Sequence, residues 1–562
     1  MAAPRKFGTF GGVFTPSILT ILGVIMYLRL PWIVGQGGMW SAIAIVLVAH
    51  LISITTGLSV ASIATDKRVR AGGTYYMVSR SLGLPIGGTL GLALFVGLSF
   101  SVSLYLIGFS ESFLSYWGVE VTRNSIRLAG TIALLAVTVL TFISTSLALR
   151  SQYFILTAIV LSLVSIFLGS HDFAPEQPLL SAVPSAVPWM VLFGIFFPAV
   201  TGFEAGVSMS GDLRDPKRSI PVGTIAAITV GLVTYIGLAI YFSYTVSAAD
   251  LIGNPNILLE MSAVPALVIA GIWGATLSSA LGSILGAPRI LQAAAADRIG
   301  PRFFARGYGK DNEPRNALLM TFLIAEAGIL IGELDIIARV VSMFFITTYG
   351  FLNLSSALES WASPDFRPEF RIPRAVSVIG SLACFIVMIL LDFLAMVGAT
   401  LVLGTLFFYL KRRELTLESG DTWEGVWSSV VRTGLQRLSR TVAHRRNWRP
   451  NIILFSGGAQ ARPHLLALGQ WLVRKRGLLS TFELIERREA ATFFAKSEQA
   501  LREPGEGESG VFTRRLECRD LYEGMESVAQ VYGFSGVEPN TVMMGWGRNS
   551  RQPDRFAATI GG

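Results

Sequence analysis

Length, composition and charge place this chain among membrane proteins. Of its 562 residues, 52% are hydrophobic and only 15% are charged, whereas soluble domains carry about 25% charged residues. The net charge of +9 is more typical of basic cytoplasmic loops than of a nucleic-acid-binding surface, so we expect no nucleic-acid partner. The only two cysteines, Cys384 and Cys518, exclude a disulfide framework and a metal cluster built on cysteine.

Apolar stretches recur along much of the chain, each close to the roughly 20 residues that a membrane-spanning helix needs. They predict an α-helical membrane domain over residues 13–410, preceded by a short cytosolic N-terminus at 1–12. We expect twelve transmembrane helices in this domain. Their ranges are 13–36, 40–64, 84–115, 126–148, 152–169, 188–211, 221–246, 263–296, 315–332, 335–358, 374–391 and 393–410.

The distribution of Lys and Arg among the loops predicts how these helices are oriented. The loops 170–187 and 247–262 contain neither residue, which is typical of the outer side of a membrane. Arg123, in the loop 116–125, is an exception. Loops that follow even-numbered helices hold many basic residues, among them Lys67, Arg68, Arg70, Arg150, Lys217, Arg218, Arg298, Arg302, Arg306, Lys310, Arg367, Arg371 and Arg374. Both termini are therefore expected in the cytoplasm.

The composition becomes that of a soluble region after the last apolar segment. Residues 411–449 predict an amphipathic connector, whose basic end contacts either anionic lipid or the following domain. Residues 450–562 predict a cytosolic α/β domain, because two strand-like runs, NIILF and LLSTFELIE, flank the helical run HLLALGQWLV. The glycine pair after the first strand is compatible with a phosphate site, but such turns more often only connect a strand to a helix.

Two of the expected spans carry signals that interrupt a helix. In the sixth span, Pro198 lacks a backbone N–H and Gly202 is a weak helix former, so the backbone around Thr201 is expected to leave the helix. The first span has Gly23 at mid-membrane with the polar Thr20 beside it. Unpaired backbone groups are costly in hydrocarbon, so such breaks persist where they line a cavity or bind something. Breaks at corresponding positions of two halves point to a transporter site; a proline kink used only for packing is the alternative.

Several long strings of this sequence resemble the cation–chloride cotransporters, which belong to the amino acid–polyamine–organocation superfamily. The resemblance runs in order through nearly the whole chain. The strings are GVIMYLRLPWIVGQGG (23–38), GGTYYMVSRSLG (72–83), YLIGFSES (105–112), TGFEAGVSMSGDLRDPKRSIPVGTIAAI (201–228), ATLSSALGSILGAPRILQA (275–293) and NWRPNIILFSGGAQARPHLL (447–466). The short loop 247–262 departs from many animal members and hints at a prokaryotic member.

The resemblance implies an inverted five-helix repeat of the leucine transporter (LeuT) type and a cytosolic domain that assists dimerisation. It further implies an electroneutral symporter of the plasma (cell) membrane that moves chloride with Na⁺, K⁺ or both by alternating access. No enzymatic activity and no cofactor are expected, and the partners are membrane lipid, the transported ions and a second copy of the chain. Two alternatives remain: an H⁺- or Na⁺-coupled amino acid or polyamine transporter on the same scaffold, and a transport-inactive scaffold that signals through its cytosolic domain.

The resemblance also assigns residues to ion sites. Those implied to bind sodium are Leu19 and Leu22, through backbone oxygens, with Ala275, Ser278 and Ser279. Those implied to bind potassium are Thr20, Ile21, Tyr105, Pro198 and Thr201. Those implied to bind chloride are Gly23, Val24 and Ile25 at one site, and Gly202, Phe203, Glu204 and Tyr349 at a second. Free backbone N–H groups suit an anion well.

Three of these positions depart from the family pattern. Thr20 stands where the family has Asn, and Leu22 stands where it has Trp. Glu204 replaces an apolar residue, and a carboxylate at mid-membrane is a functional hypothesis by default. An ionised Glu204 would repel chloride and attract a cation or amine, whereas a protonated one would couple transport to H⁺. Alternatively, its side chain points away from the site and pairs with a neighbouring donor.

Arg29 and Glu111 match a family pair that closes the outer side of the transport pathway. Their opposite charges lie near the outer ends of the first and third expected spans. The resemblance therefore implies an outer gate, and a static ion pair at the membrane interface is the alternative.

Overall fold

The structure is a computed structural model. It describes residues 7–66, 72–143, 145–169, 173, 175, 177–183, 187–208, 213–309, 312–363, 366–412, 422–440, 448–457, 462–474, 477–486, 495–496, 511–534, 537–545 and 552–561. The chain divides into two compact units, Met1–Val426 and Trp427–Gly562.

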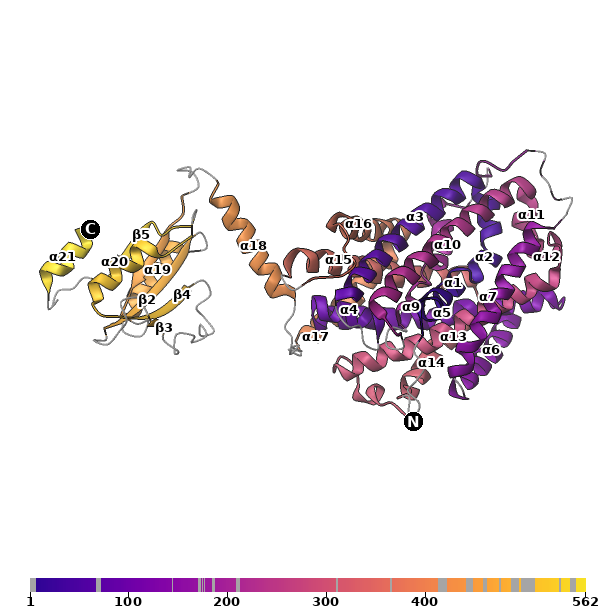
Figure 1. Cartoon of the computed structure of the whole chain (residues 1–562), viewed down its shortest axis with the longest axis horizontal. Coiled ribbons are helices and arrows are strands. Elements are labelled where there is room, and N and C mark those ends of the chain that lie inside the picture. The colour runs from indigo at the N-terminus through magenta and orange to yellow at the C-terminus, as the bar shows by residue number, and fades with distance from the viewer. Residues whose placement is uncertain are drawn as a thin grey trace. The chain divides into compact units, whose positions relative to one another are not determined.

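The larger unit is a bundle of helices (Figure 1). In chain order these are η1 (a π-helix, Phe10–Phe14), α1 (Thr15–Ile21), α2 (Val24–Leu28), α3 (Leu30–Asp66), α4 (Gly73–Leu82), α5 (Leu84–Tyr116), α6 (Arg123–Ile143), α7 (Thr145–Phe167), α8 (Trp189–Phe196), η2 (a 3-10 helix, Phe197–Val200), α9 (Glu204–Ser208), α10 (Pro216–Thr245), α11 (Ala248–Gly253), α12 (Ile257–Glu260), α13 (Pro265–Ala296), η4 (Arg302–Ala305), α14 (Arg315–Ile331), α15 (Leu334–Ala362), α16 (Arg374–Leu391) and α17 (Phe393–Lys411).

The lengths and apolarity of these helices are those of a membrane protein. Within the described residues, nine helical segments are long and apolar enough to cross a bilayer, and Gln152–Phe167 and Met396–Lys411 are shorter apolar helices. Each of the twelve predicted ranges overlaps a helix. The chain is therefore a helical membrane protein, and the number of twelve spans stays a prediction.

The first two predicted spans differ from the structure in where they are separated. The sequence predicts an interruption between 36 and 40, but α3 runs through this stretch with a kink at Gly38, whose φ is 68°. A Cβ on Gly38 would lie 2.5 Å from the carbonyl carbon of Ser181, so the kink needs glycine both for its backbone conformation and for space. The loop segment around Ser181 therefore packs directly on the kink.

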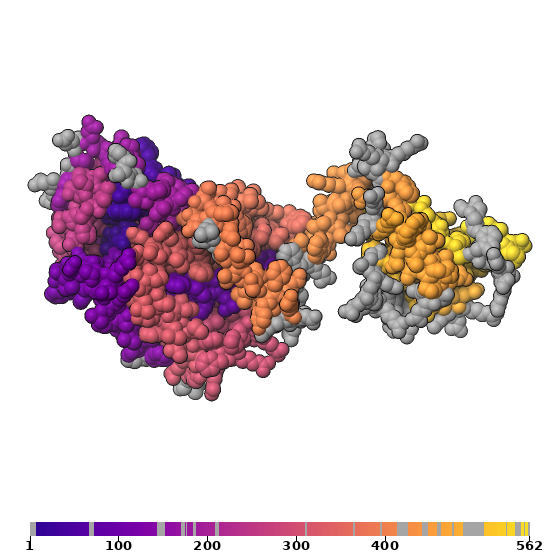
Figure 2. All heavy atoms as spheres, turned by 180° about the vertical axis from the view of Figure 1, so that it is seen from behind, coloured from indigo at the N-terminus to yellow at the C-terminus, as the bar shows by residue number. Residues whose placement is uncertain are grey.

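The surface of the larger unit is apolar where helices face outward. Figure 2 shows α17, in orange, on one such face. Its side chains Leu401, Val402 and Phe408 are each more than 60% exposed. Contiguous apolar surface of this kind is uncommon on soluble monomers but suits contact with lipid. Inside the unit, α13 packs against α5 and α7, and α3 packs against α10.

The smaller unit contains a five-stranded sheet in the order β3-β4-β2-β1-β5. Its strands are β1 (Asn451–Phe455), β2 (Leu478–Glu486), β3 (Ala495–Lys496), β4 (Val511–Cys518) and β5 (Thr541–Met544), and its helices are α19 (Pro463–Val473), α20 (Leu521–Val531) and α21 (Pro553–Gly561). All strand pairs are parallel except β3 with β4. Alternate residues of β1 enter two separate cores, one with Leu466 of α19 and one with Val528 of α20. Helices thus cover both faces, as a parallel sheet requires.

The elements predicted in the C-terminal part are present at β1, α19 and β2. The predicted connector, 411–449, contains α18 (Thr422–Leu438), while 413–421 and 441–447 lie outside the described residues. The glycine pair after β1 is described only up to Gly457. The boundaries of the cytosolic domain therefore stay a prediction.

Candidate functional site

The first helix break separates α1 from α2. Leu22 (φ −83°, ψ 45°) and Gly23 (φ −91°, ψ −153°) leave the helical conformation, as the sequence predicts. Among the described residues, no donor reaches the carbonyls of Leu19 and Leu22, and the N–H groups of Gly23, Val24 and Ile25 reach no backbone acceptor. The break therefore offers both carbonyl oxygens and amide hydrogens at the same depth of the bundle.

The second break separates η2 from α9. Thr201, Gly202 and Phe203 lie outside any helix, which confirms the interruption predicted from Pro198 and Gly202. Thr201 donates its side-chain hydroxyl to the Pro198 carbonyl at 2.8 Å. The N–H groups of Gly202 and Phe203 have no backbone acceptor in the described part of the chain. This break also leaves amide hydrogens available to a ligand.

The two breaks pack directly against each other. A Cβ on Gly202 would lie 2.6 Å from the Thr20 Cβ and 2.8 Å from the Ile21 nitrogen, so only glycine fits there. Ser17, one turn before the first break, donates its hydroxyl to the Phe203 carbonyl at 3.2 Å. On the other side, a Cβ on Gly23 would lie 3.5 Å from the Ser279 Oγ of α13. Residues implied for all three ions are thus brought to one place.

Buried tyrosines from the surrounding helices line the region where the two breaks meet. Tyr349 of α15 donates its hydroxyl to the Thr201 carbonyl at 2.9 Å, and Tyr235 of α10 donates to the Ile21 carbonyl at 2.6 Å. Tyr105 of α5 is close enough for its hydroxyl to interact electrostatically with both. Tyr105 and Tyr349 are predicted site residues. Sequence reasoning misses Tyr235, because a single tyrosine in an apolar span carries no signal.

The predicted sodium residues of α13 are buried in the bundle. Ala275, Ser278 and Ser279 are at most 9% exposed. The Ser279 hydroxyl is buried and has no hydrogen-bond partner among the residues that the structure describes. Thr276, on the same helix, bonds instead to the Ile272 carbonyl at 2.8 Å, as hydroxyls in helices commonly do. Because nearly all buried polar groups are paired, an unpaired hydroxyl beside a helix break is a candidate ligand.

The predicted potassium residues keep oxygen lone pairs available. Thr20 donates its hydroxyl to the Pro16 carbonyl at 3.0 Å, and Thr201 donates to Pro198. A hydroxyl that donates its hydrogen still has lone pairs for a cation. Thr20 is also the only partly exposed residue between Thr15 and Tyr27. Its side chain therefore borders a space that solvent reaches.

Glu204 is buried at the second break. It is the first residue of α9, is 4% exposed, and interacts electrostatically with the Tyr349 hydroxyl. The carboxyl group thus lies beside the residues implied for the second chloride. Tyr349 already donates to Thr201, so a chloride bound at Tyr349 would have to exchange that hydrogen bond.

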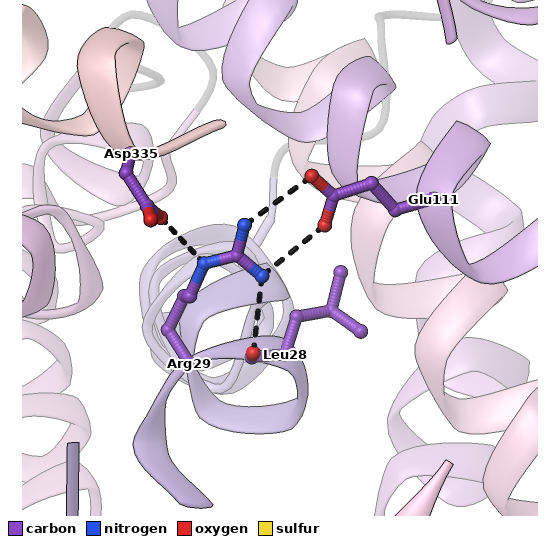
Figure 3. Close-up of polar contacts among 4 residues, drawn as sticks. All are labelled: Leu28, Arg29, Glu111 and Asp335. Atoms are coloured by element: carbon purple, nitrogen blue, oxygen red, sulfur yellow. Dashed lines mark hydrogen bonds and ion pairs between the residues drawn. The ribbon is translucent and has the colours of Figure 1, made fainter. Parts of the chain in front are cut away.

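A separate charged cluster lies at the far end of α2 (Figure 3). Arg29 donates to both carboxylate oxygens of Glu111, from α5, at 3.1 and 3.2 Å, and its Nε donates to the Asp335 Oδ1, from α15, at 2.5 Å. The side chains of Arg29 and Glu111 are 18% and 19% exposed. The predicted pair is therefore formed, and Asp335 extends it to a third helix. Asp335 lies in no motif from which this contact could be predicted.

A gate at this cluster should weaken when one carboxylate is neutralised. We expect Glu111→Gln to raise about tenfold the rate at which a membrane-impermeant thiol reagent modifies a cysteine placed at Thr20, with Cys384 and Cys518 replaced. Hydrogen bonds to charged groups contribute about 1.5–3 kcal/mol, which sets this scale. Glu120→Gln, an exposed acid in the loop that follows α5, is the control. An unchanged rate would indicate a static ion pair.

A bundle of apolar helices with two interrupted helices packed on one another is typical of membrane transport proteins. A sequence profile of the amino acid permease family matches residues 12–453, and the chain belongs to this family. It is similar to solute carrier family 12 member 2 of Mus musculus (31% identical, covering 98% of this chain and 51% of the relative) and to member 1 of Mus musculus (31%, 98% and 56%) and of Homo sapiens (31%, 97% and 56%).

The chain spans about half the length of these curated relatives. Because they are members of solute carrier family 12, the resemblance to the cation–chloride cotransporters is confirmed. The family is one of permeases and not of enzymes, as predicted.

Proposed function

We propose that this chain is a secondary active symporter that moves chloride together with Na⁺, K⁺ or both by alternating access. One observation carries the proposal: two helix breaks contact each other through Gly202, beside the Ser279 hydroxyl, which has no hydrogen-bond partner in the described part of the chain. Carbonyl oxygens, hydroxyls and amide hydrogens meet there in a buried place. Broken helices at the membrane midplane are how transporters of this kind present such groups to ions.

The cation sites follow from the oxygen donors. Sodium is held by the carbonyls of Leu19 and Leu22 and the hydroxyls of Ser278 and Ser279, with Ala275 as the small residue of the site. Potassium is held by Thr20, the Ile21 and Pro198 carbonyls, Tyr105 and Thr201. The carbonyls of Leu19 and Leu22 and the Ser279 hydroxyl have no partner among the residues that the structure describes, and they support the sodium site, because a buried polar group needs a partner. The lone pairs left on the Thr20 and Thr201 hydroxyls support the potassium site.

The chloride sites follow from the amide hydrogens. One site uses the N–H groups of Gly23, Val24 and Ile25, and a second uses those of Gly202, Phe203 and Glu204 with the Tyr349 hydroxyl. Glu204 aside, the other five of these six N–H groups have no backbone acceptor among the described residues, and this supports the two sites. A carboxylate at Glu204 disfavours an anion at the second site, so we expect the first site to be the stronger one.

The wider architecture is proposed from the same family relationship. It comprises twelve spans with an inverted five-helix repeat, both termini and the C-terminal α/β domain in the cytoplasm, and a homodimer in the plasma membrane in contact with lipid. The basic loops support this orientation. No cofactor is needed, because the ions are the cargo.

The test is uptake of labelled chloride into proteoliposomes that contain the purified full chain, with Na⁺ and K⁺ replaced separately. We expect uptake that requires at least one of the two cations, and Glu204→Met to retain it. The chain could instead take up an amino acid or polyamine in a pH-dependent way that Glu204→Met abolishes. The proposed cargo would then be wrong, whereas the proposed fold would stand. Absence of flux with every solute would point to a transport-inactive scaffold.

A further inference from the structure

The Ile21 carbonyl has a hydrogen-bond donor that comes from another helix. Ile21 is the last residue of α1, so the N–H that a continuing helix would supply is missing. Tyr235 of α10 takes its place and donates its hydroxyl at 2.6 Å across 214 residues of sequence. This carbonyl is also the one proposed as a potassium ligand.

Packing around the Tyr235 ring restricts the direction in which its hydroxyl points. Tyr235 is fully buried. Its ring packs edge-on against Phe196, with centroids 5.1 Å apart, and lies 6.1 Å from the His50 ring. Phe196 is the last residue of α8, in the same span as the second break, so Tyr235 contacts both broken spans. Its position is therefore set by the same residues that shape the site.

We propose that Tyr235 is a positioning and release residue of the potassium site, whose hydroxyl competes with the bound cation for the Ile21 carbonyl. This inference rests on the proposed function and adds a residue that the family resemblance does not assign. While the cation is bound, the partially positive hydroxyl hydrogen of Tyr235 lies against the same carbonyl oxygen, so it repels the cation and weakens cation binding. When the cation leaves, the hydroxyl remains as the partner of the carbonyl.

The physical reason is the cost of an unpaired carbonyl at the break. A buried carbonyl without a donor is strongly disfavoured, so a site that lacked Tyr235 would hold its cation more tightly. A transported ion must bind well enough to enter but weakly enough to leave. Tyr235 therefore makes the site less tight and faster to empty.

Tyr235→Phe tests this without changing the packing, because phenylalanine keeps the ring and loses the hydroxyl. The same helix offers a matched control in Tyr241, whose hydroxyl donates to the Ile166 carbonyl at 2.9 Å. Ile166 lies on α7, away from both breaks in sequence. Tyr241→Phe therefore removes the same kind of bond from the same helix without touching the Ile21 carbonyl.

The experiment measures the half-saturating concentrations of K⁺, Na⁺ and chloride, and the maximal rate, for labelled chloride uptake by the full chain in proteoliposomes. We expect Tyr235→Phe to lower the half-saturating K⁺ concentration about three- to tenfold, the scale of one hydrogen bond. The maximal rate should fall by a similar factor because release slows. The half-saturating concentrations of Na⁺ and chloride for Tyr235→Phe should stay within about twofold of the wild type. The same limit of about twofold should hold for the maximal rate and all half-saturating concentrations of Tyr241→Phe.

Two results would overturn the inference while the proposed function stands. One is a wild type coupled to K⁺ whose half-saturating K⁺ concentration is unchanged or raised by Tyr235→Phe. The other is a shift of all three ions together, which would mean a general loosening of packing. A second measurement of K⁺ binding is the K⁺ dependence of the thermal unfolding midpoint of the detergent-solubilised protein, because an ion that binds the folded state raises this midpoint. A wild type that shows K⁺ dependence in neither uptake nor midpoint would remove the potassium site itself, and the inference with it.

Discussion

Gly202→Ala is expected to reduce chloride uptake about 100-fold, the scale of a misplacement of about 1 Å at a reacting site. The added Cβ would lie 2.6 Å from the Thr20 Cβ and 2.8 Å from the Ile21 nitrogen. These neighbours are backbone and near-backbone atoms, so no flexible side chain can yield. The two breaks must separate, and the ion ligands on them separate as well. The measurement is the maximal rate of uptake into proteoliposomes.

The control for Gly202→Ala is a glycine in a helix with free space around it. A Cβ added at Gly286 of α13 would meet no atom within 4 Å outside its own stretch of helix backbone, so Gly286→Ala should transport at a rate close to that of the wild type. Size-exclusion chromatography of both variants separates loss of transport from loss of folding. Uptake within about twofold of the wild type in a folded Gly202→Ala would contradict the contact between the breaks.

The breaks themselves can be predicted from the sequence, because their causes are local. Pro198 cannot donate a hydrogen bond, and Gly202 and Gly23 are weak helix formers. What the sequence cannot predict is which distant groups satisfy the interrupted backbone. Tyr235 and Ile21 are 214 residues apart, and Asp335 is 306 residues from Arg29. Such partners depend on how the helices pack, for which a single sequence carries no signal.

The smaller unit shows the same division between local and distant causes. β1 and β2 are predictable because their apolar runs are buried in the middle of the sheet. β4 is not, since only its end residues Val511 and Cys518 are buried, and the residues between them, Arg514 and Arg515 included, are exposed or half-buried. At Gly38 the sequence predicts a gap between two helices, whereas the structure has a kink within α3. The reason is that a glycine with positive φ can bend a helix without ending it.

The shortness of α2 connects the site to the outer cluster. This helix has five residues, begins next to Gly23 at the first break and ends next to Arg29. At about 1.5 Å per residue, it is about 7.5 Å long. A change at the first break therefore moves Arg29 relative to Glu111 and Asp335 almost directly. Ion binding at the break and opening of the outer cluster are expected to be coupled through this short helix.

Ser279→Ala is expected to raise the half-saturating Na⁺ concentration about 10- to 100-fold, the scale of a lost bond to a charged group. The Ser279 hydroxyl is buried beside Gly23 and has no partner in the described part of the chain, so replacing it by alanine breaks no hydrogen bond among those residues. The protein should therefore fold as well as the wild type, and the half-saturating concentrations of K⁺ and chloride should stay unchanged. A loss confined to Na⁺ would separate a ligand from a packing residue.

The matched control is Thr276→Val, which removes another buried hydroxyl from α13. Thr276 bonds to the Ile272 carbonyl of its own helix and so has its partner within the protein. Thr276→Val should therefore leave the half-saturating Na⁺ concentration unchanged. If both variants changed Na⁺ dependence equally, or neither did, the unpaired hydroxyl would be a packing feature, since small residues also serve helix contact in membranes. If only Ser279→Ala changed it, the missing partner of that hydroxyl would be the sodium ion.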